Sequence, residues 1–123
     1  MTHLDANFLV SALQRGTLEE TKVNSWLGAK ETLGISAVAW AEVFCGPLSP
    51  RDELIARQMF QSIEVLSGVD AEFAAQLLNK TGRRSRSLAD CMIAAVAIRA
   101  GAKLATLNTS DFRPFVPHGL ALA

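Results

Sequence analysis

Short apolar segments alternate with longer segments of helical periodicity along most of the chain. Apolar segments of strand length fall around residues 3–4, 35–38, 63–66, 103–106 and 120–123. Between them, apolar residues recur three or four positions apart and predict helices over 7–14, 17–27, 37–46, 51–62, 70–80 and 89–100. Strands separated by helices form parallel sheets with helices on both faces. The pattern therefore predicts an α/β fold.

Local signals indicate where several of these helices begin and end. Ser49-Pro50 is typical of an N-cap followed by the first helical residue. Asp70 is an N-cap candidate for the next helix. Gly46-Pro47 and Gly101 are typical of helix ends. The residues 109–113 predict a turn before the last apolar segment.

Composition and length indicate one ordered domain over residues 1–123. Half of the residues are apolar and a fifth are charged, which is typical of a globular chain that buries a core. Twelve basic and twelve acidic residues cancel, so a nucleic-acid surface has to be a local patch. Cys45 and Cys91 show no metal-ligand spacing and are interpreted as buried, reduced residues.

Two features bear on location. The N-terminus MTHLDANFLV lacks the basic region of a signal peptide. The longest unbroken apolar run, 91–98, is eight residues long and is too short to span a bilayer. We expect a soluble cytoplasmic protein that does not contact a membrane.

Four carboxylates stand out by their apolar context: Asp5, Glu42, Asp90 and Asp111. Asp5, Ser36 and Thr106 fall near the carboxyl ends of predicted strands, where sites form in parallel sheets. Buried carboxylates that lie together repel one another, and a divalent cation removes that conflict. Oxygen ligands without a His or Cys cluster suit Mg²⁺ or Mn²⁺ rather than Zn²⁺. Such a site ionises water and stabilises charge on a phosphate during hydrolysis.

Each carboxylate also has a purely structural interpretation. Asp5 and Asp90 are placed to cap helices or to interact with helix dipoles. Glu42 fits an exposed edge of its helix, and Asp111 fits a turn. The spacing of the four residues does not by itself bring them together, so both interpretations stay open at this point.

Three stretches carry a resemblance to a known family: HLDANFLV, ISAVAWAEVFCG and ADCMIAAVAIRAGAKLATLNTSDF. In this order and spacing they resemble a PIN domain, and in particular the VapC toxins of bacterial toxin–antitoxin pairs. The resemblance covers nearly the whole chain. It implies a three-layer α/β/α sandwich with a central, mostly parallel sheet.

The resemblance also implies roles for individual residues. Asp5, Glu42 and Asp90 match the first three acidic positions of the family, and Asp111 matches a fourth that is often acidic. Asn108 stands where many members have Asp, so one Mg²⁺ or Mn²⁺ is expected, with Asp5 and Asp90 as its ligands. The polar residues expected to orient the acids through hydrogen bonds are Asn7, Ser36, Thr106 and Asn108. Local turn or cap bonding is the alternative for these residues.

The function implied by the resemblance is a Mg²⁺-dependent endoribonuclease toxin. It further implies a homodimer and neutralisation by a VapB-like antitoxin. One alternative is a PIN nuclease outside toxin–antitoxin systems, in RNA processing or repair. Another is a PIN-like domain that only binds RNA or protein. A phosphatase of another α/β family fits less well, because no phospho-acceptor motif follows Asp5.

A basic stretch, NKTGRRSRS, precedes Asp90 and contains Arg83, Arg84 and Arg86. Arginine pairs well with phosphate oxygens, so these residues are candidates to hold the RNA backbone near the acids. The alternatives are a solvated loop between helices and a surface that docks an acidic partner.

Replacing Arg83, Arg84 and Arg86 together by Ala tests the RNA interpretation. We expect weaker RNA binding and a flatter dependence of affinity on salt, because fewer counterions are released from phosphates. The measurement is RNA affinity and cleavage over a series of salt concentrations. Unchanged cleavage with an unchanged salt slope would show that the arginines do not hold RNA.

Overall fold

The sheet at the centre of the molecule is parallel throughout. The computed structural model describes residues 1–82 and 87–123, and the candidate RNA-binding residues Arg83, Arg84 and Arg86 lie outside the described residues. The strands are β1 (Thr2–Leu4), β2 (Leu33–Gly34), β3 (Lys103–Ala105) and β4 (Ala121–Leu122). Their order is β2-β1-β3-β4, and each neighbouring pair is parallel.

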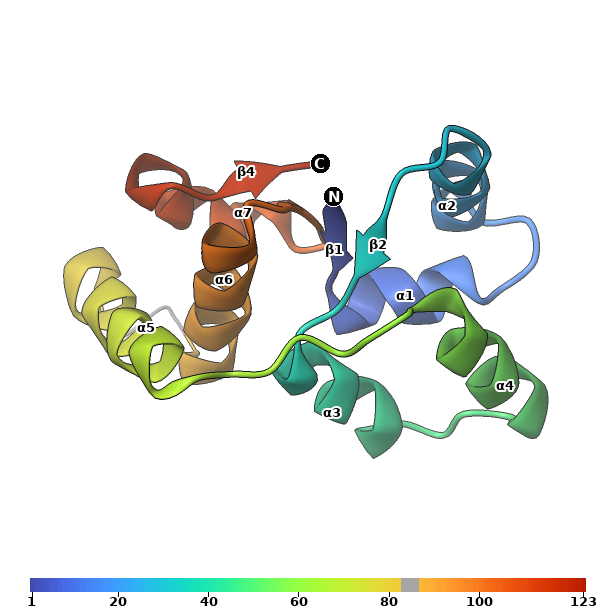
Figure 1. Ribbon diagram of the computed structural model, residues 1–123, viewed down its shortest axis with the longest axis horizontal. Coiled ribbons are helices and arrows are strands. Elements are labelled where there is room, and N and C mark those ends of the chain that lie inside the picture. Colours follow the sequence, from blue (N-terminus) through green and yellow to red (C-terminus); the bar gives the residue numbers. More distant parts are fainter. Residues whose placement is uncertain (83–86) are drawn as a thin grey trace.

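Helices cover both faces of this sheet. They are α1 (Ala6–Ala12), α2 (Leu18–Gly28), α3 (Ala37–Cys45), α4 (Pro50–Met59), α5 (Gly68–Thr81), α6 (Leu88–Ala100) and α7 (Thr109–Phe112), followed by the 3₁₀ helix η1 (Arg113–His118). Figure 1 shows α5 and α6 on one side of the strands and α1, α2 and α4 on the other. The predicted three-layer α/β/α arrangement is therefore confirmed.

Hydroxyl N-caps set the starts of five helices. Thr17, Ser36, Ser49, Ser67 and Ser87 each accept a hydrogen bond from the backbone N–H three residues further on. Such a cap satisfies one of the N–H groups that a helix start leaves without a partner. At the other end of α6, Gly101 adopts a left-handed conformation, as the sequence predicts for a helix-terminating glycine.

Some predicted boundaries are wrong, for local reasons. The strand expected at 35–38 is β2, two residues earlier, because Ser36 caps α3 and Ala37 is already helical. The strand expected at 63–66 is reduced to one parallel bridge between Glu64 and Ser36. Asp70 is the third residue of α5 and not its N-cap; its carboxylate accepts from the Ser67 N–H in a capping box.

The core forms where the sheet meets α1, α3 and α6. In α6 the buried residues run almost without interruption from Cys91 to Ala97, which explains why this helix shows little polar periodicity. Phe112 on α7 and Phe115 on η1 are fully buried and complete this core; their ring centroids lie 5.9 Å apart.

The prediction that both cysteines are buried is half right. Cys91 is buried, but Cys45 is exposed at the end of α3. Within residues 1–82 and 87–123, no helix combines the length and apolar character that crossing a membrane requires.

His3 and Gly34 meet between the edge strand β2 and its neighbour β1. They are register partners on β1 and β2, and His3 is 1% exposed. A Cβ atom at position 34 would lie 2.7 Å from the His3 Cδ2 atom. Glycine is therefore the residue that lets the imidazole ring lie flat against the neighbouring strand.

An ion pair between the buried Asp70 and the exposed Arg99 joins α5 to α6. The Asp70 carboxylate, 2% exposed, accepts hydrogen bonds of 2.9 and 3.0 Å from the Arg99 Nε. Arg99 also donates to the Val65 carbonyl at 3.0 Å. Burial alone raises the pKa of Asp70, but the hydrogen bonds from the Ser67 backbone and Arg99 bring it below its usual value.

Replacing Arg99 by Met tests this pair. We expect a loss of about 1–3 kcal/mol in the free energy of unfolding at pH 7, because the buried Asp70 carboxylate loses its cation. An acid whose pKa is lowered in the fold stabilises above its unfolded pKa, and this stabilisation is lost as the pH falls through the folded value. The difference from wild type should therefore shrink below about pH 4.

Urea unfolding at several pH values is the measurement. Arg51→Met is the matched control, because the ion pair of Arg51 with Asp52 is partly exposed and is worth about 0.5 kcal/mol. The stabilising role of the Arg99–Asp70 pair would be contradicted if Arg99→Met lost no more free energy of unfolding than Arg51→Met. A loss that grew toward low pH would contradict it as well.

Candidate active site at the carboxyl edge of the sheet

The parallel sheet brings the ends of β1 and β3 to one edge. Asp5 follows β1 and Thr106 follows β3, and the Asp5 N–H donates to the Ala105 carbonyl at 2.9 Å. Ser36 lies two residues beyond β2 at the same edge. The three polar residues predicted at strand ends therefore do lie at the carboxyl edge, where parallel sheets form their sites.

Asp5 is the buried centre of this edge. It is 5% exposed, and each carboxylate oxygen accepts one hydrogen bond. The Ala6 N–H donates to Oδ1 at 2.8 Å, which makes Asp5 the N-cap of α1. The Thr106 hydroxyl donates to Oδ2 at 2.7 Å. Burial raises the pKa of Asp5, and these two hydrogen bonds oppose the rise.

Thr106 is itself held in place. Its hydroxyl oxygen accepts from the Asn108 N–H at 3.0 Å, so its proton remains directed at Asp5. Thr106 thus orients an acid as predicted, and Asn108 contributes through its backbone. The Asn108 side chain makes no capping hydrogen bond to α7.

Asp5 and Asp90 lie close enough to Glu42 to act on it electrostatically. Glu42 lies on α3 and Asp90 is the third residue of α6. The pKa of Glu42 is raised, first by partial burial of its carboxylate and then by the negative charges of Asp5 and Asp90. Three acids that are far apart in the sequence therefore interact electrostatically at one edge. Glu42 is exposed, as in the interpretation that places it on an exposed edge of its helix.

The cap ahead of Asp90 is Ser87. The Asp90 N–H donates to the Ser87 hydroxyl at 3.0 Å, so Asp90 occupies the first turn of α6 and not the cap position. The dipole of α6 favours a negative charge there. The spacing Ser87-x-x-Asp90 is the signal from which this arrangement follows.

Asn7 supports the loop after β3, and Asp111 lies on α7. The Asn7 side-chain oxygen accepts from the Leu107 N–H at 3.2 Å, so Asn7 holds the loop after β3 and reaches Asp5 only through Thr106. Asp111 is half-buried on α7 and is not among the groups that raise the pKa of Asp5 or Glu42. Ser36 accepts from the Ala39 N–H and positions the start of the Glu42 helix.

The donor set at this edge suits a hard cation. In the part of the chain that the structure describes, no three His, Cys, Asp or Glu side chains are arranged to hold a metal ion together. Mg²⁺, however, is commonly held by one or two carboxylates together with water and substrate phosphates. Burial, and after it repulsion by Asp5 and Asp90, raises the pKa of Glu42, and a divalent cation would relieve the repulsion.

Comparison with known proteins identifies the family. The family model described as PIN domain matches residues 3–114, and the chain belongs to the PIN domain family. The predicted resemblance is thereby confirmed. A search of curated proteins finds no significant match.

Solved structures of toxin–antitoxin proteins share the fold. VapBC2 from Rickettsia felis, bound to a DNA fragment from their promoter, matches with a TM-score of 0.76 and 21% identity over 99% of this chain and 96% of that chain. FitAcB from Neisseria gonorrhoeae matches with a TM-score of 0.74 and 22% identity over 99% and 96%. A toxin–antitoxin complex from Klebsiella pneumoniae matches with a TM-score of 0.72 and 24% identity over 91% and 90%.

Replacing Glu42 by Gln tests the repulsion among the acids. We expect the Tm of the metal-free protein at pH 7.5 to rise by about 1–3 °C, a few tenths of a kcal/mol, because one of three like charges is removed. The difference should shrink as the pH falls through the usual range of a glutamate carboxyl, since residue 42 then becomes neutral in both proteins. Thermal unfolding in EDTA is the measurement. Glu72→Gln on the exposed face of α5 is the control, and a rise no larger than that of the control would refute the interaction.

Proposed function

We propose that this chain is a Mg²⁺-dependent endoribonuclease toxin of the VapC type that hydrolyses RNA phosphodiester bonds. The observation that carries the proposal is the buried carboxylate of Asp5, which Thr106 holds at the carboxyl edge of the sheet and which, with Asp90, acts electrostatically on Glu42. Carboxylates that repel one another at a sheet edge favour a cation-dependent site over a purely structural role. Membership of the PIN family, whose members are generally nucleases, supports the same proposal.

In this proposal Asp5 and Asp90 hold Mg²⁺, or Mn²⁺ in its place. When bound, the cation lowers the pKa of a water molecule and stabilises negative charge on the phosphate. The side-chain oxygens present suit such a hard cation. A single ion is proposed, because Asn108 supplies an amide where a further carboxylate would be needed for a second ion.

The remaining residues orient the metal-binding acids, accept a proton or support the elements on which the acids lie. The Thr106 hydroxyl fixes the orientation of Asp5, and the first turn of α6 favours the ionised form of Asp90. Glu42, exposed at the site and with a raised pKa, is placed to accept a proton from attacking water. Asp111 is the proposed fourth acid. Asn7, Ser36 and Asn108 support the loop and helix on which the acids lie.

Further parts of the proposal concern partners. Structural neighbours from toxin–antitoxin complexes support control by a VapB-like antitoxin. We extend the proposal to a cytoplasmic homodimer in which residues 1–123 act as one domain. Arg83, Arg84 and Arg86 are proposed to hold the RNA backbone.

The decisive test is cleavage of a mixed tRNA and ribosomal RNA pool by wild type and Asp90→Asn. We expect discrete fragments from wild type with Mg²⁺ or Mn²⁺, none with EDTA, and a loss of about 100-fold or more in the variant, as for loss of a group that stabilises transition-state charge. Glu72→Gln serves as the control and should cleave like wild type.

A second readout does not depend on activity. Mg²⁺ should raise the Tm of wild type by mass action and should have little effect on Asp90→Asn. Equal cleavage by the variant would refute the assigned site. A rise in Tm with Mg²⁺ but no cleavage of any RNA would favour the alternative of a PIN-like domain that only binds RNA or protein. Cleavage with no antitoxin-like reading frame beside the gene would favour a PIN nuclease outside toxin–antitoxin systems.

A further inference from the structure

The backbone of Asn108 is fixed near Asp5, but its side chain is not used within the chain. The Asn108 N–H donates to the Thr106 hydroxyl oxygen at 3.0 Å, and that hydroxyl donates to Asp5 at 2.7 Å. One hydroxyl group therefore lies between the Asn108 backbone and the Asp5 carboxylate. The Asn108 side chain is exposed, makes no capping hydrogen bond to α7 and has no hydrogen-bond partner within residues 1–82 and 87–123.

The other neutral polar side chains at this edge are already engaged. The hydroxyls of Thr106 and Ser36 are buried; the first donates to Asp5, and the second accepts from the Ala39 N–H. The Asn7 side-chain oxygen accepts from the Leu107 N–H. Among the polar, uncharged side chains of the acidic edge, the amide of Asn108 is therefore the one that is both accessible and open to a ligand at its oxygen and its nitrogen.

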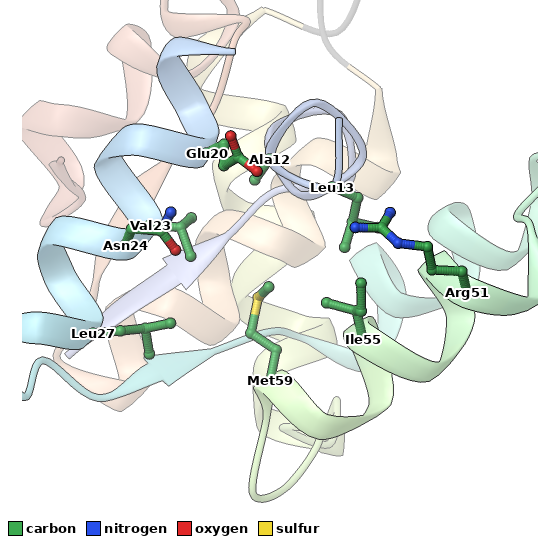
Figure 2. Close-up of a pocket in the computed structure, with 9 residues that line it drawn as sticks. All are labelled: Ala12, Leu13, Glu20, Val23, Asn24, Leu27, Arg51, Ile55 and Met59. Atoms are coloured by element: carbon green, nitrogen blue, oxygen red, sulfur yellow. The ribbon is translucent and has the colours of Figure 1, made fainter. Parts of the chain in front are cut away.

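The cavity between α1, α2 and α4 does not offer a comparable contact to a ligand at the acids. Its volume is about 160 Å³. Figure 2 shows that side chains of α2 and α4 form its walls, with Ala12 at the end of α1. Asp5 caps the opposite end of that helix, and the cation on the cavity wall, Arg51, already pairs with Asp52 at 3.0 Å. A nucleotide held at the acids is therefore recognised by residues of the acidic edge itself.

Hydrolysis by water does not by itself select RNA over DNA. In the proposed function the oxygen that attacks phosphorus comes from water, so the ribose 2′-hydroxyl is neither the nucleophile nor the leaving group. The 2′-hydroxyl donates and accepts hydrogen bonds, and it is the group by which a protein distinguishes RNA from DNA at a given position. Selection of RNA therefore requires a side chain near the scissile phosphate that pairs with this hydroxyl.

A neutral amide suits this contact better than a carboxylate does. The Asn side chain offers an acceptor oxygen and an NH₂ donor, so it matches a hydroxyl group in either direction. A carboxylate at position 108 would only accept, and its charge would repel the phosphate of the substrate as well as Asp5. The amide that stands where many PIN domains have Asp therefore gives up a possible metal ligand and gains a substrate contact.

We propose that Asn108 is a specificity-determining residue, whose side-chain amide forms a hydrogen bond with the 2′-hydroxyl of a ribose next to the scissile phosphate. This inference rests on the proposed function, since it names the group by which the same site recognises RNA. Asn108 does not touch the reacting atoms and does not hold the cation. Its removal therefore lowers the preference for ribose over deoxyribose and leaves the cation site in place.

The first experiment combines changes in the substrate and in the protein. An RNA oligonucleotide that wild type cleaves is prepared with a single 2′-deoxy nucleotide, placed in turn at each position around the cleavage site. We expect the kcat/KM of wild type to fall about tenfold at one position, as for loss of a neutral hydrogen bond. Asn108→Ala should lose about tenfold on the all-ribose oligonucleotide and nothing further with the 2′-deoxy nucleotide at that position, because both changes remove the same hydrogen bond.

Three controls isolate the amide. Asn108→Ala keeps the backbone N–H that supports Thr106, so it tests the side chain alone. Thr109→Ala is the matched control, because Thr109 is the exposed neighbour of Asn108, and it should keep the full sensitivity to the 2′-deoxy position. Asn108→Ser supplies a hydroxyl that also donates and accepts and should recover part of this sensitivity. Mg²⁺ should raise the Tm of Asn108→Ala as much as that of wild type.

A binding measurement gives a readout that does not depend on cleavage. A short RNA and the DNA of the same sequence are titrated with Mg²⁺ in the Glu42→Gln background, from which the proposed proton acceptor has been removed. RNA should bind about tenfold more tightly than DNA. The addition of Asn108→Ala should remove most of this preference, and the addition of Thr109→Ala should leave it unchanged.

The outcomes separate the two proposals. Equal cleavage of RNA and DNA by wild type, or full sensitivity to the 2′-deoxy position in Asn108→Ala, would overturn the inference while leaving the nuclease in place. An equal loss of sensitivity in Thr109→Ala would overturn it as well. A wild type that cleaves no RNA, but whose preference for binding RNA disappears with Asn108→Ala, would support the contact and reject the nuclease. No cleavage together with equal binding of RNA and DNA would overturn both.

Discussion

A buried carboxylate at the end of β1 is the constraint on which the acidic edge depends. Asp5 is held at the junction of β1, α1 and the loop after β3, and two hydrogen bonds replace part of the water that burial removes. Burial still raises its pKa, so these hydrogen bonds do not fully compensate for desolvation. The loop from Thr106 to Asn108, itself tied to Asn7, is therefore part of the environment that keeps the acid ionised.

The other two acids come from helices that start near the same edge. Ser36 and Ser87 cap α3 and α6, and these caps fix where Glu42 and Asp90 fall relative to Asp5. The pKa of Glu42 is raised first by burial and then by the charges of Asp5 and Asp90, so both desolvation and repulsion disfavour its ionised form. Strain of this kind is typical of functional sites, where stability is given up for chemistry.

The sequence predicts the elements well and their junctions less well. The apolar run of α6, the glycine at its end and the serine-proline start of α4 each act locally, so pattern alone places them. The short strand β2 ends earlier than predicted because the local cap at Ser36 starts α3 there. The predicted strand at 63–66 is reduced because its single bridge to Ser36 depends on tertiary pairing. The positions of Asp5, Ser36 and Thr106 near the carboxyl ends of predicted parallel strands suffice to predict that they share one edge. The hydrogen bond from the Leu107 N–H to Asn7 and the Arg99–Asp70 pair each join residues that are distant in the sequence. No local pattern reveals such pairings.

The contact between His3 and Gly34 has a consequence for how this sequence can vary. The imidazole ring occupies the volume that a side chain on β2 would need, and neither ring nitrogen has a hydrogen-bond partner among the described residues. The ring therefore acts as a filler whose shape, rather than its hydrogen bonding, is matched to the neighbouring strand. Positions 3 and 34 are coupled through volume, so a relative that carries a side chain at the position of Gly34 should carry a smaller residue at the position of His3. The two positions should change together in descendants of this sequence, although they lie on strands separated by two helices.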